Sequence, residues 1–386
     1  MDLLLILYKK EIMTIIAITA NTSWYLYNFR KNTISSMIDS GYDVIAIAPQ
    51  DEYSQKLVKL GCRFINIDID KGGTNPINDL KTLFSFYSIF KKEKPEVVLN
   101  FTPKNNIYST ICASLFKISV INNIAGLGIL FINESTSSKI ARTLYKYSQK
   151  KASKIFFQNE DDRALFLKNN LAPIHLTDRL PGSGVDLTRF SPQLSTDDGK
   201  VVFLLVARML FDKGIGYYVD AARVMKAKYG EKVEFRLLGF LDVDNPSAVS
   251  KIQMNEWVEE GIINYLGTSD SVELEIAKVD CMVLPSYYRE GVPKSLLEAG
   301  AMAKPIITTD NVGCRETVKD GVNGFLCDVR STESLLTCLE KIVEMSHDKR
   351  LDMGRKSRLK IENEFAEDIV INKYLNAIEQ CLKMNG

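Results

Sequence analysis

Short apolar runs rich in β-branched residues alternate with helix-length segments along the first half of this chain. Continuous apolar strands separated by helices are typical of a parallel sheet that is covered on both faces. The predicted strands are residues 15–19, 44–48, 64–67, 97–101, 120–124 and 155–158. The predicted helices between them are residues 28–39, 78–92 and 138–151.

The alternation pauses at residues 181–199, where a Pro-Gly-Ser-Gly sequence and a Ser-Pro pair indicate a linker. It then starts again, with predicted strands at 201–206, 234–238, 263–266, 281–284 and 305–309, and predicted helices at 214–228, 250–259, 295–303 and 332–345. Because 386 residues are too many for one ordinary core, we predict two doubly wound, Rossmann-like α/β domains that face each other across a cleft. The predicted boundaries are 1–180 for the first domain, 181–199 for the linker, 200–364 for the second domain, and 365–386 for a C-terminal helix that packs back on the first domain.

The composition excludes several classes of protein. A net charge of +1 argues against a nucleic-acid binder. The seven cysteines are scattered without a C-x-x-C pair and there are only two histidines, so we expect reduced core cysteines, a cytoplasmic location and no bound metal. The apolar run at residues 3–8 is too short for a signal peptide or a membrane span, and Met13 is the expected true start.

The charges are unevenly divided between the two halves. Residues 1–180 carry 23 Lys and Arg against 16 Asp and Glu, whereas residues 181–386 carry 26 against 32. Residues 138–154 hold six cations and no acid, and residues 83–92 mix aromatic residues with lysines. Such helices can lie on an anionic membrane surface, although a sheet-covering helix with a solvated basic face has the same pattern.

The strongest functional signal is the sequence Pro-Ser-Tyr-Tyr-Arg-Glu-Gly-Val-Pro-Lys-Ser-Leu-Leu-Glu-Ala at residues 285–299. An apolar strand leads into a loop with Glu290 and Gly291, and Pro293 suits the first turn of the following helix. The free N–H groups of that turn suit nucleotide phosphates, and Glu298 can accept hydrogen bonds from two ribose hydroxyls. An ordinary βα turn with an acid near a helix N-terminus explains the same residues.

A second signal follows the strand at 201–206. Arg208 and Lys213 are five residues apart across a turn, where they could converge on a diphosphate. Taken alone, the two residues are also consistent with an ordinary surface arginine and lysine.

Together these motifs resemble those of glycosyltransferase family 4, which are retaining enzymes of the GT-B fold. Arg-x4-Lys-Gly precedes Pro-Ser-x3-Glu-Gly-x-Pro-x-Ser-x2-Glu-Ala, and residues 182–192 match the interdomain signature G-V-D-x-x-x-F-x-P of that family. Residues 313–316 and 320–325 match further family stretches. The resemblance implies that Glu290 contacts the donor sugar beside the backbone of Gly291 and Val292. It also implies that Glu298 holds the ribose, and that Arg208, Lys213 and the helix N-terminus at Ser295 and Leu296 stabilise the departing diphosphate.

The first domain resembles bacterial enzymes that build polyprenyl-diphosphate-linked oligosaccharides. The matching stretches are residues 27–30, 100–108 and 122–128. Many relatives have a glycine-rich loop after the first strand and a histidine near position 103, whereas this chain has Asn21 in a loop without glycine and Pro103 with Lys104. Lys104 or backbone groups therefore replace an imidazole, and the acceptor-side candidates are Asn21, Lys104 and Asn106.

The resemblance implies a UDP-sugar donor, a polyprenyl-diphosphate-linked saccharide acceptor, transfer of a hexose or N-acetylhexosamine, and attachment to the inner face of the cell membrane. No cofactor or metal is expected, because cationic side chains serve the diphosphate. The Asp-x-Asp sequences at residues 68–70 and 242–244 are interpreted as solvated loop acids. The alternatives are a nucleotide-sugar epimerase, a non-catalytic sugar-binding protein, and a transferase that acts on a soluble acceptor.

Overall fold

The computed structural model describes residues 13–70, 75–127, 136–193, 197–241 and 243–385, which form two compact α/β units. The first unit contains the chain up to Ala125, residues 136–180 and the C-terminal residues from Ile371. The second unit contains Pro181–Val370 together with Gly126 and Leu127. The stretch 181–193, predicted as part of a linker, is therefore grouped with the second unit. Residues 1–12, which precede the predicted start at Met13, lie outside the described residues.

The first unit is built on a seven-stranded sheet in the order β3-β2-β1-β4-β5-β6-β7, in which every pair of neighbours is parallel. Its strands are β1 (Ile15–Thr19), β2 (Asp43–Ala48), β3 (Arg63–Asn66), β4 (Val97–Asn100), β5 (Ser119–Ile124), β6 (Lys154–Phe157) and β7 (Thr177–Arg179). The six predicted strands agree with β1–β6 within one residue at each end. The three-residue β7 was not predicted, because it contains no apolar run that could mark it.

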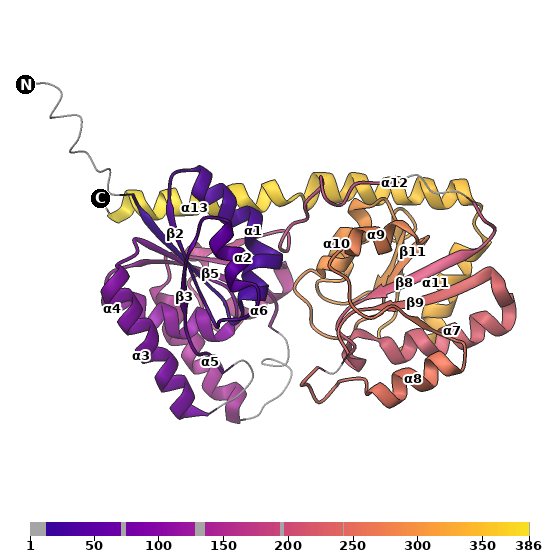
Figure 1. Ribbon diagram of the computed structural model, residues 1–386, viewed down its shortest axis with the longest axis horizontal. Coiled ribbons are helices and arrows are strands. Elements are labelled where there is room, and N and C mark those ends of the chain that lie inside the picture. Colours follow the sequence, from indigo (N-terminus) through magenta and orange to yellow (C-terminus); the bar gives the residue numbers. More distant parts are fainter. Residues whose placement is uncertain (1–12, 71–74, 128–135, 194–196, 242, 386) are drawn as a thin grey trace, which may run out of the picture. The chain divides into compact units, whose positions relative to one another are not determined.

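Helices cover both faces of this sheet. In Figure 1, α1 and α2 lie on one face, and α3, α4 and α5 lie on the other, as right-handed crossovers require. The helices are α1 (Ser23–Asp39), α2 (Ser54–Lys59), α3 (Pro76–Glu93), α4 (Thr110–Leu115), α5 (Thr136–Ser148) and α6 (Glu160–Lys168). Helix α1 begins five residues before the predicted start, because the Thr22 side chain accepts a hydrogen bond from the Tyr25 N–H and caps the helix.

The C-terminal helix α13 (Glu367–Asn385) contributes to the core of the first unit from Ile371 onward. The Tyr374 ring packs edge-on against Phe101, which directly follows β4, and against Phe156, which lies in β6. The fully buried guanidinium of Arg30 lies 4.4 Å from the centre of the Phe101 ring and 5.8 Å from that of Tyr374. These aromatic and cation–π contacts tie the end of the chain to its first helix.

The second unit has a six-stranded sheet in the order β10-β9-β8-β11-β12-β13, again parallel throughout. Its strands are β8 (Val201–Val206), β9 (Val233–Leu238), β10 (Asn264–Tyr265), β11 (Cys281–Leu284), β12 (Ile306–Thr309) and β13 (Gly324–Cys327). Strand β13 was not predicted. It begins at Gly324, where a Cβ atom would lie 1.9 Å from the Ile306 carbonyl oxygen, so glycine here allows close pairing rather than a turn.

The helices of the second unit are α7 (Ile215–Tyr229), α8 (Lys251–Glu259), α9 (Val272–Ala277), α10 (Lys294–Ala301), α11 (Thr332–Glu344) and α12 (His347–Glu364). Helix α12 was not predicted, because eleven of its eighteen residues are charged or histidine and its apolar face is narrow. The helix packs closely against the backbone of Ala303 at Gly354, where a Cβ atom would lie 1.9 Å from the Ala303 carbonyl oxygen.

Candidate active site

The two sequence motifs of the second unit meet at the carboxyl end of its sheet. Strands β8 and β11 are parallel neighbours, so the loops that follow them emerge side by side. The carbonyl oxygen of Asp212 accepts hydrogen bonds from the N–H groups of Tyr287 and Tyr288, at 3.1 and 3.2 Å, and from the Ser286 hydroxyl at 3.2 Å. One backbone carbonyl in the first loop therefore holds three residues of the second loop.

Lys213 and Glu290, for which the motifs predict different contacts with the donor, form an ion pair with each other. Lys213 Nζ donates a hydrogen bond to Glu290 Oε1, which lies 2.9 Å from the buried Ser286 hydroxyl. The single proton of that hydroxyl is shared between Glu290 and the Asp212 carbonyl oxygen. Glu290 is only 9% exposed, so an unpaired carboxylate would be costly at this position. The pair orients both side chains before any ligand binds.

Arg208 lies near the same cluster and is exposed. Burial is the main cause that raises the pKa of Tyr288, the charge of Glu290 raises it further, and the charge of Arg208 opposes the shift. Lys213 Nζ lies 5.2 Å from the centre of the Tyr288 ring. Tyr288 thus lies near both predicted diphosphate cations, although the motifs predicted no role for it.

The backbone around Glu290 and Gly291 is held from the other side by the loop after β12. The Asn311 amide donates to the Tyr288 carbonyl oxygen at 2.9 Å, and the Thr309 hydroxyl donates to the Ser286 carbonyl oxygen. Gly313 has a φ of +80°, and a Cβ atom there would lie 1.7 Å from the Gly291 carbonyl oxygen. Only glycine allows the two loops to approach this closely.

We therefore expect Gly313→Ala to displace the Glu290–Gly291 loop. The matched control is Gly321→Ala, since Gly321 has a similar φ of +71° but no atom within 4 Å of the place that a Cβ would take. Both variants carry the backbone strain, which costs about 1–2 kcal/mol, but only Gly313→Ala adds a steric clash. The value of kcat/KM with a nucleotide sugar should fall at least about tenfold further for Gly313→Ala than for the control. Thermal unfolding of both variants shows whether they are folded. Equal activity of the two variants would contradict this account of the loop.

Helix α10 presents its N-terminus at the same end of the sheet. Pro293 is its N-cap residue, Gly291 and Val292 are buried immediately before it, and Ser295 is partly exposed in its first turn, followed by the buried Leu296. Glu298 lies one turn further, and burial raises the pKa of its carboxyl group while the charges of Lys294 and Arg189 partly oppose the shift. Within the described part of the chain, no hydrogen bond or ion pair engages the Glu298 carboxylate, so it can accept hydrogen bonds from a ligand.

In the first unit, a chain of buried polar side chains crosses the carboxyl ends of three strands. The Thr19 hydroxyl donates to Asn100 Oδ1 at 2.8 Å, and the Asn100 amide donates to Asn122 Oδ1 at 2.9 Å. The Asn122 amide donates to Gln149 Oε1 at 2.8 Å, and the Gln149 amide donates to the Asn106 carbonyl oxygen at 3.0 Å. A satisfied network of this kind makes the strand ends rigid.

The three acceptor-side candidates have different surroundings. Asn21 is partly exposed after β1, and Lys104 Nζ pairs with Asp79 of α3 at 2.6 Å. Asn106 is 1% exposed and lies in the π-helix Asn105–Ser109, a form that is often found at functional sites. Just before it, Thr102 has a φ of 102°, which is strained for a β-branched residue.

The Asp-x-Asp sequence at residues 68–70 lies in the first unit, where Asp68 and Asp70 line a cavity of about 340 Å³ with Asn78, Lys81 and Thr82. The second such sequence includes residue 242, which lies outside the described residues. A search of the described chain finds no group of three His, Cys, Asp or Glu side chains placed to hold a metal ion. In the same residues, no helix is both long and apolar enough to cross a bilayer.

Comparison with known proteins matches both units to transferase families. Residues 187–360 match the model of the glycosyl transferases group 1, and residues 15–159 match that of the glycosyl transferase 4-like proteins. The chain is 30% identical over 381 residues to the N,N'-diacetylbacillosaminyl-diphospho-undecaprenol alpha-1,3-N-acetylgalactosaminyltransferase of Campylobacter jejuni, covering 93% of this chain and 96% of the relative. This chain is a glycosyltransferase of family 4.

Other relatives of the glycosyltransferase agree with this assignment. The UDP-Gal:alpha-D-GlcNAc-diphosphoundecaprenol alpha-1,3-galactosyltransferase of Escherichia coli is 27% identical over 75% of this chain and 76% of its own length. Among solved structures, a glycosyltransferase of Rickettsia africae has a TM-score of 0.78 at 17% identity and covers 96% of this chain and 99% of its own. Anabaena HepE with UDP-glucose has a TM-score of 0.77 at 15% identity, with 95% and 99% covered. The glycosyltransferase therefore has the predicted GT-B fold.

Several residues that shape both sites of the glycosyltransferase were not predicted from the sequence. Thr309 and Asn311 act through backbone carbonyls, for which no side-chain motif exists. Thr19, Asn100 and Asn122 could have been found, because each is a polar residue in a strand that is otherwise apolar and buried.

Proposed function

We propose that this glycosyltransferase moves a hexose or N-acetylhexosamine from a UDP-sugar to a polyprenyl-diphosphate-linked saccharide, with retention of the anomeric configuration. The observation that supports it most strongly is the cluster of Arg208, Lys213 and Glu290 beside the N-terminus of α10, at the carboxyl end of the sheet. Ligands of doubly wound sheets bind at this end. The similarity to two transferases whose names include diphospho-undecaprenol or diphosphoundecaprenol favours a lipid-linked acceptor.

The charges of the cluster suit a nucleotide diphosphate. Arg208 and Lys213 contribute two positive charges and Glu290 one negative charge, so the cluster has a net charge of about +1 before the donor binds. The N–H groups near Ser295 add a partial positive charge at the end of α10. Glu298 then accepts hydrogen bonds from the ribose hydroxyls, and Glu290 contacts the donor sugar beside Gly291 and Val292.

In the proposed reaction, the bond between the anomeric carbon and the diphosphate oxygen breaks, and the electron pair leaves with the UDP. Arg208 and Lys213 stabilise the developing negative charge, because they are already in position when it forms. The acceptor hydroxyl attacks the face that the leaving group vacates, and its proton passes to the leaving phosphate oxygen. No side chain is needed as a dedicated base.

The first unit offers the acceptor side. Asn21, Lys104 and Asn106 all follow the carboxyl ends of β1 and β4, the end at which parallel sheets bind ligands. Among the described residues, neither amide atom of the buried Asn123 has a hydrogen-bond partner, and unmet polar groups of this kind suit a ligand hydroxyl or a water molecule. The ammonium of Lys104 suits the diphosphate of the acceptor. To bind it, the diphosphate must compete with the Asp79 carboxylate.

The test is a screen of UDP-sugars with a polyprenyl-diphosphate-linked saccharide, in which NMR coupling of the anomeric proton reports the configuration of the product. We expect transfer with retention. An inverted product would refute the retaining mechanism, and sugar interconversion without acceptor would indicate the epimerase. Equal turnover of a soluble saccharide that lacks the lipid would support a soluble acceptor.

We further propose that transfer needs no divalent cation, because Arg208 and Lys213 supply the charge that a metal would otherwise bring to the diphosphate. Activity in excess EDTA is expected to equal that in buffer with Mg²⁺. The control is a metal-dependent glycosyltransferase assayed in parallel, which confirms that the chelator is effective. Complete loss of activity, restored by Mn²⁺ or Mg²⁺, would show that residues 68–70 or 242–244 were wrongly dismissed.

A lipid-linked acceptor and a UDP-sugar are both expected at the cytoplasmic face of the cell membrane, so we place the enzyme there as a peripheral protein. The excess of positive charge in residues 1–180 supports attraction to anionic lipid. Cell fractionation of the native protein, with a salt wash of the membrane pellet, tests this location.

A further inference from the structure

Helix α3 has apolar side chains on the side that faces away from its own sheet. Thr82, Phe86 and Phe90 are its buried residues. On the outer side, Ile77, Leu80, Phe84 and Tyr87 recur every three or four residues and are 65%, 53%, 63% and 38% exposed. A helix that only covers a sheet normally has polar residues on its outer side, so this apolar stripe requires another explanation.

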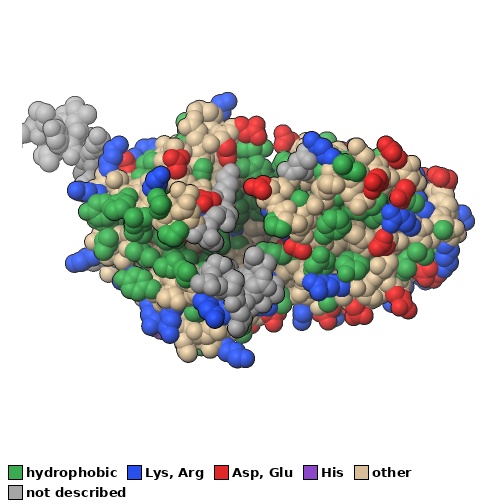
Figure 2. All heavy atoms as spheres, turned by 90° about the horizontal axis from the view of Figure 1, so that it is seen from below, with side chains coloured by type: hydrophobic (Ala, Val, Ile, Leu, Met, Phe, Trp, Pro, Cys, Tyr) green, Lys and Arg blue, Asp and Glu red, His purple; other side chains and the backbone are tan. Residues whose placement is uncertain are grey.

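The stripe continues on the two neighbouring helices of the same layer. Leu115 at the end of α4 and Ile140 and Tyr147 on α5 are each more than half exposed. Figure 2 shows hydrophobic side chains gathered over one part of the first unit, with Lys and Arg side chains around them. We call the exposed apolar and lysine residues of α3, α4, α5 and the turns that follow them the apolar–lysine surface.

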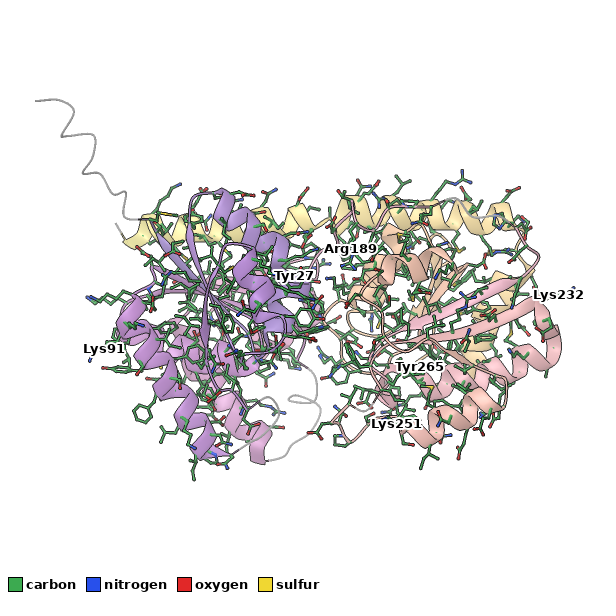
Figure 3. The ribbon with its side chains drawn as sticks, in the orientation of Figure 1. Tyr27, Lys91, Arg189, Lys232, Lys251 and Tyr265 are labelled. Carbon is green, nitrogen blue, oxygen red and sulfur yellow. The ribbon has the colours of Figure 1, made fainter. Side chains whose placement is uncertain are left out.

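The unpaired charges of α3, α4 and α5 in the described residues are mostly positive. Their acids, Asp79 and Glu93, are already paired, with Lys104 at 2.6 Å and with Arg63 at 2.6 Å respectively. Lys91 is labelled in Figure 3 at the outer end of α3. The exposed lysines are Lys81, Lys91, Lys92, Lys94, Lys117, Lys139, Lys146, Lys150 and Lys151.

We propose that the apolar–lysine surface inserts into the interface of an anionic bilayer, with its aromatic and aliphatic side chains among the acyl chains and its lysines against the lipid phosphates. This inference rests on the proposed function and makes it more specific, because it names the helices that touch the membrane. Apolar residues surrounded by lysines match the acyl–headgroup boundary. A second copy of the chain fits less well, since a symmetric dimer would bring the same lysines together, and lysine is depleted at protein interfaces.

The contact between Asp79 and Lys104 connects this surface with the acceptor side. Asp79 lies in the first turn of α3, two residues after Ile77, and holds the ammonium of Lys104. Burial and a hydrogen bond with Asp79 also raise the pKa of Tyr108. A membrane-bound α3 would therefore place an acceptor-side lysine close to the depth of the lipid phosphates, where a polyprenyl diphosphate is anchored.

The experiment compares four variants of the full chain. The apolar variant is Leu80→Ser with Phe84→Ser, and its control is Ile252→Ser with Leu359→Ser, which are 73% and 56% exposed on the second unit. The charge variant is Lys146→Glu, Lys150→Glu and Lys151→Glu, and its control changes Lys232, Lys251 and Lys349 of the second unit to Glu. Co-sedimentation uses vesicles of phosphatidylcholine with phosphatidylglycerol, and of phosphatidylcholine alone, at low and at high salt.

We expect the apolar variant to bind anionic vesicles at least about tenfold more weakly at both salt concentrations, since two large side chains no longer leave water. The charge variant should lose a similar factor at low salt but little at high salt, where lysines are already screened. The second-unit controls should bind like the native chain. Native-like binding by the apolar variant at high salt would overturn the proposal, as would self-association of the native chain that the apolar variant abolishes.

Two further measurements separate this proposal from the proposed function. Transfer to an acceptor dispersed in detergent should be unchanged in both surface variants, because neither changes the candidate active site. Loss of this activity together with a lower melting temperature would show misfolding, and Leu80→Ser alone then provides the milder apolar variant. Vesicle binding without any transferase activity in the native chain would leave the membrane surface standing and refute the proposed reaction.

Discussion

Replacement of Arg208 by alanine is expected to lower kcat by at least about a hundredfold, with a smaller change in KM. In the proposed reaction, its guanidinium stabilises charge that develops on the diphosphate as the bond to the sugar breaks, so its loss should raise the barrier more than it weakens the ground-state complex. Arg208 is exposed, and its removal leaves no buried group without a partner. The measurements are steady-state kinetics at saturating acceptor and thermal unfolding.

The matched control is Arg223→Ala on α7, since Arg223 is a partly exposed arginine that pairs with Asp220 and Glu260 outside the cluster. We expect native turnover for this control. Arg208→Lys is expected to recover only part of the activity, because an ammonium cannot bind two phosphate oxygens side by side as a guanidinium does. Native kcat in a folded Arg208→Ala protein would remove this residue from the site.

Replacement of Glu298 by glutamine is expected to raise KM for the donor by at least about tenfold and to leave kcat nearly unchanged. The ribose hydroxyls do not react, so the contact is equally strong in the ground state and in the transition state. Donor competition with UDP should weaken by the same factor. The control is Glu333→Gln in the first turn of α11, an exposed acid at a comparable helix end.

The raised pKa of Glu298 gives this variant a second readout. A carboxyl group whose pKa is higher in the folded than in the unfolded protein favours the folded state as the pH falls, and its ionised form is unfavourable above that pKa. Glu298→Gln should therefore not lower the melting temperature at neutral pH. In the native protein, donor affinity should fall at acidic pH as Glu298 is protonated, and this fall should be smaller in the Glu298→Gln variant. A destabilised variant whose donor KM is native would show that Glu298 serves the fold and not the ribose.

Much of the fold could be predicted from the chain itself. The apolar strands β1, β8 and β11 were predicted with their observed ends, because a buried parallel strand is a continuous apolar run with polar residues at both ends. The half-exposed edge strand β7 and the polar helix α12 were missed, since neither buries enough apolar surface to leave a pattern.

The candidate site was chosen from sequence motifs, and the roles of its residues toward the donor stay predictions. The motifs selected Arg208, Lys213, Glu290 and Glu298, because the loops that follow parallel strands commonly carry the side chains that bind ligands. The motifs did not show that Lys213 and Glu290 pair with each other. That contact joins residues 77 positions apart, and it depends on the shared Asp212 carbonyl that holds the two loops together.

The sequence by itself determined the two parallel sheets, since these depend on local periodicity, and its short motifs selected the candidate donor-site residues. Only the tertiary structure decided which of these residues touch, and which face of α3 is exposed. A helical pattern with apolar residues on two sides does not reveal which side meets the sheet. In the structure, Phe86 and Phe90 are packed inside the first unit, whereas Ile77, Leu80 and Phe84 are in contact with solvent.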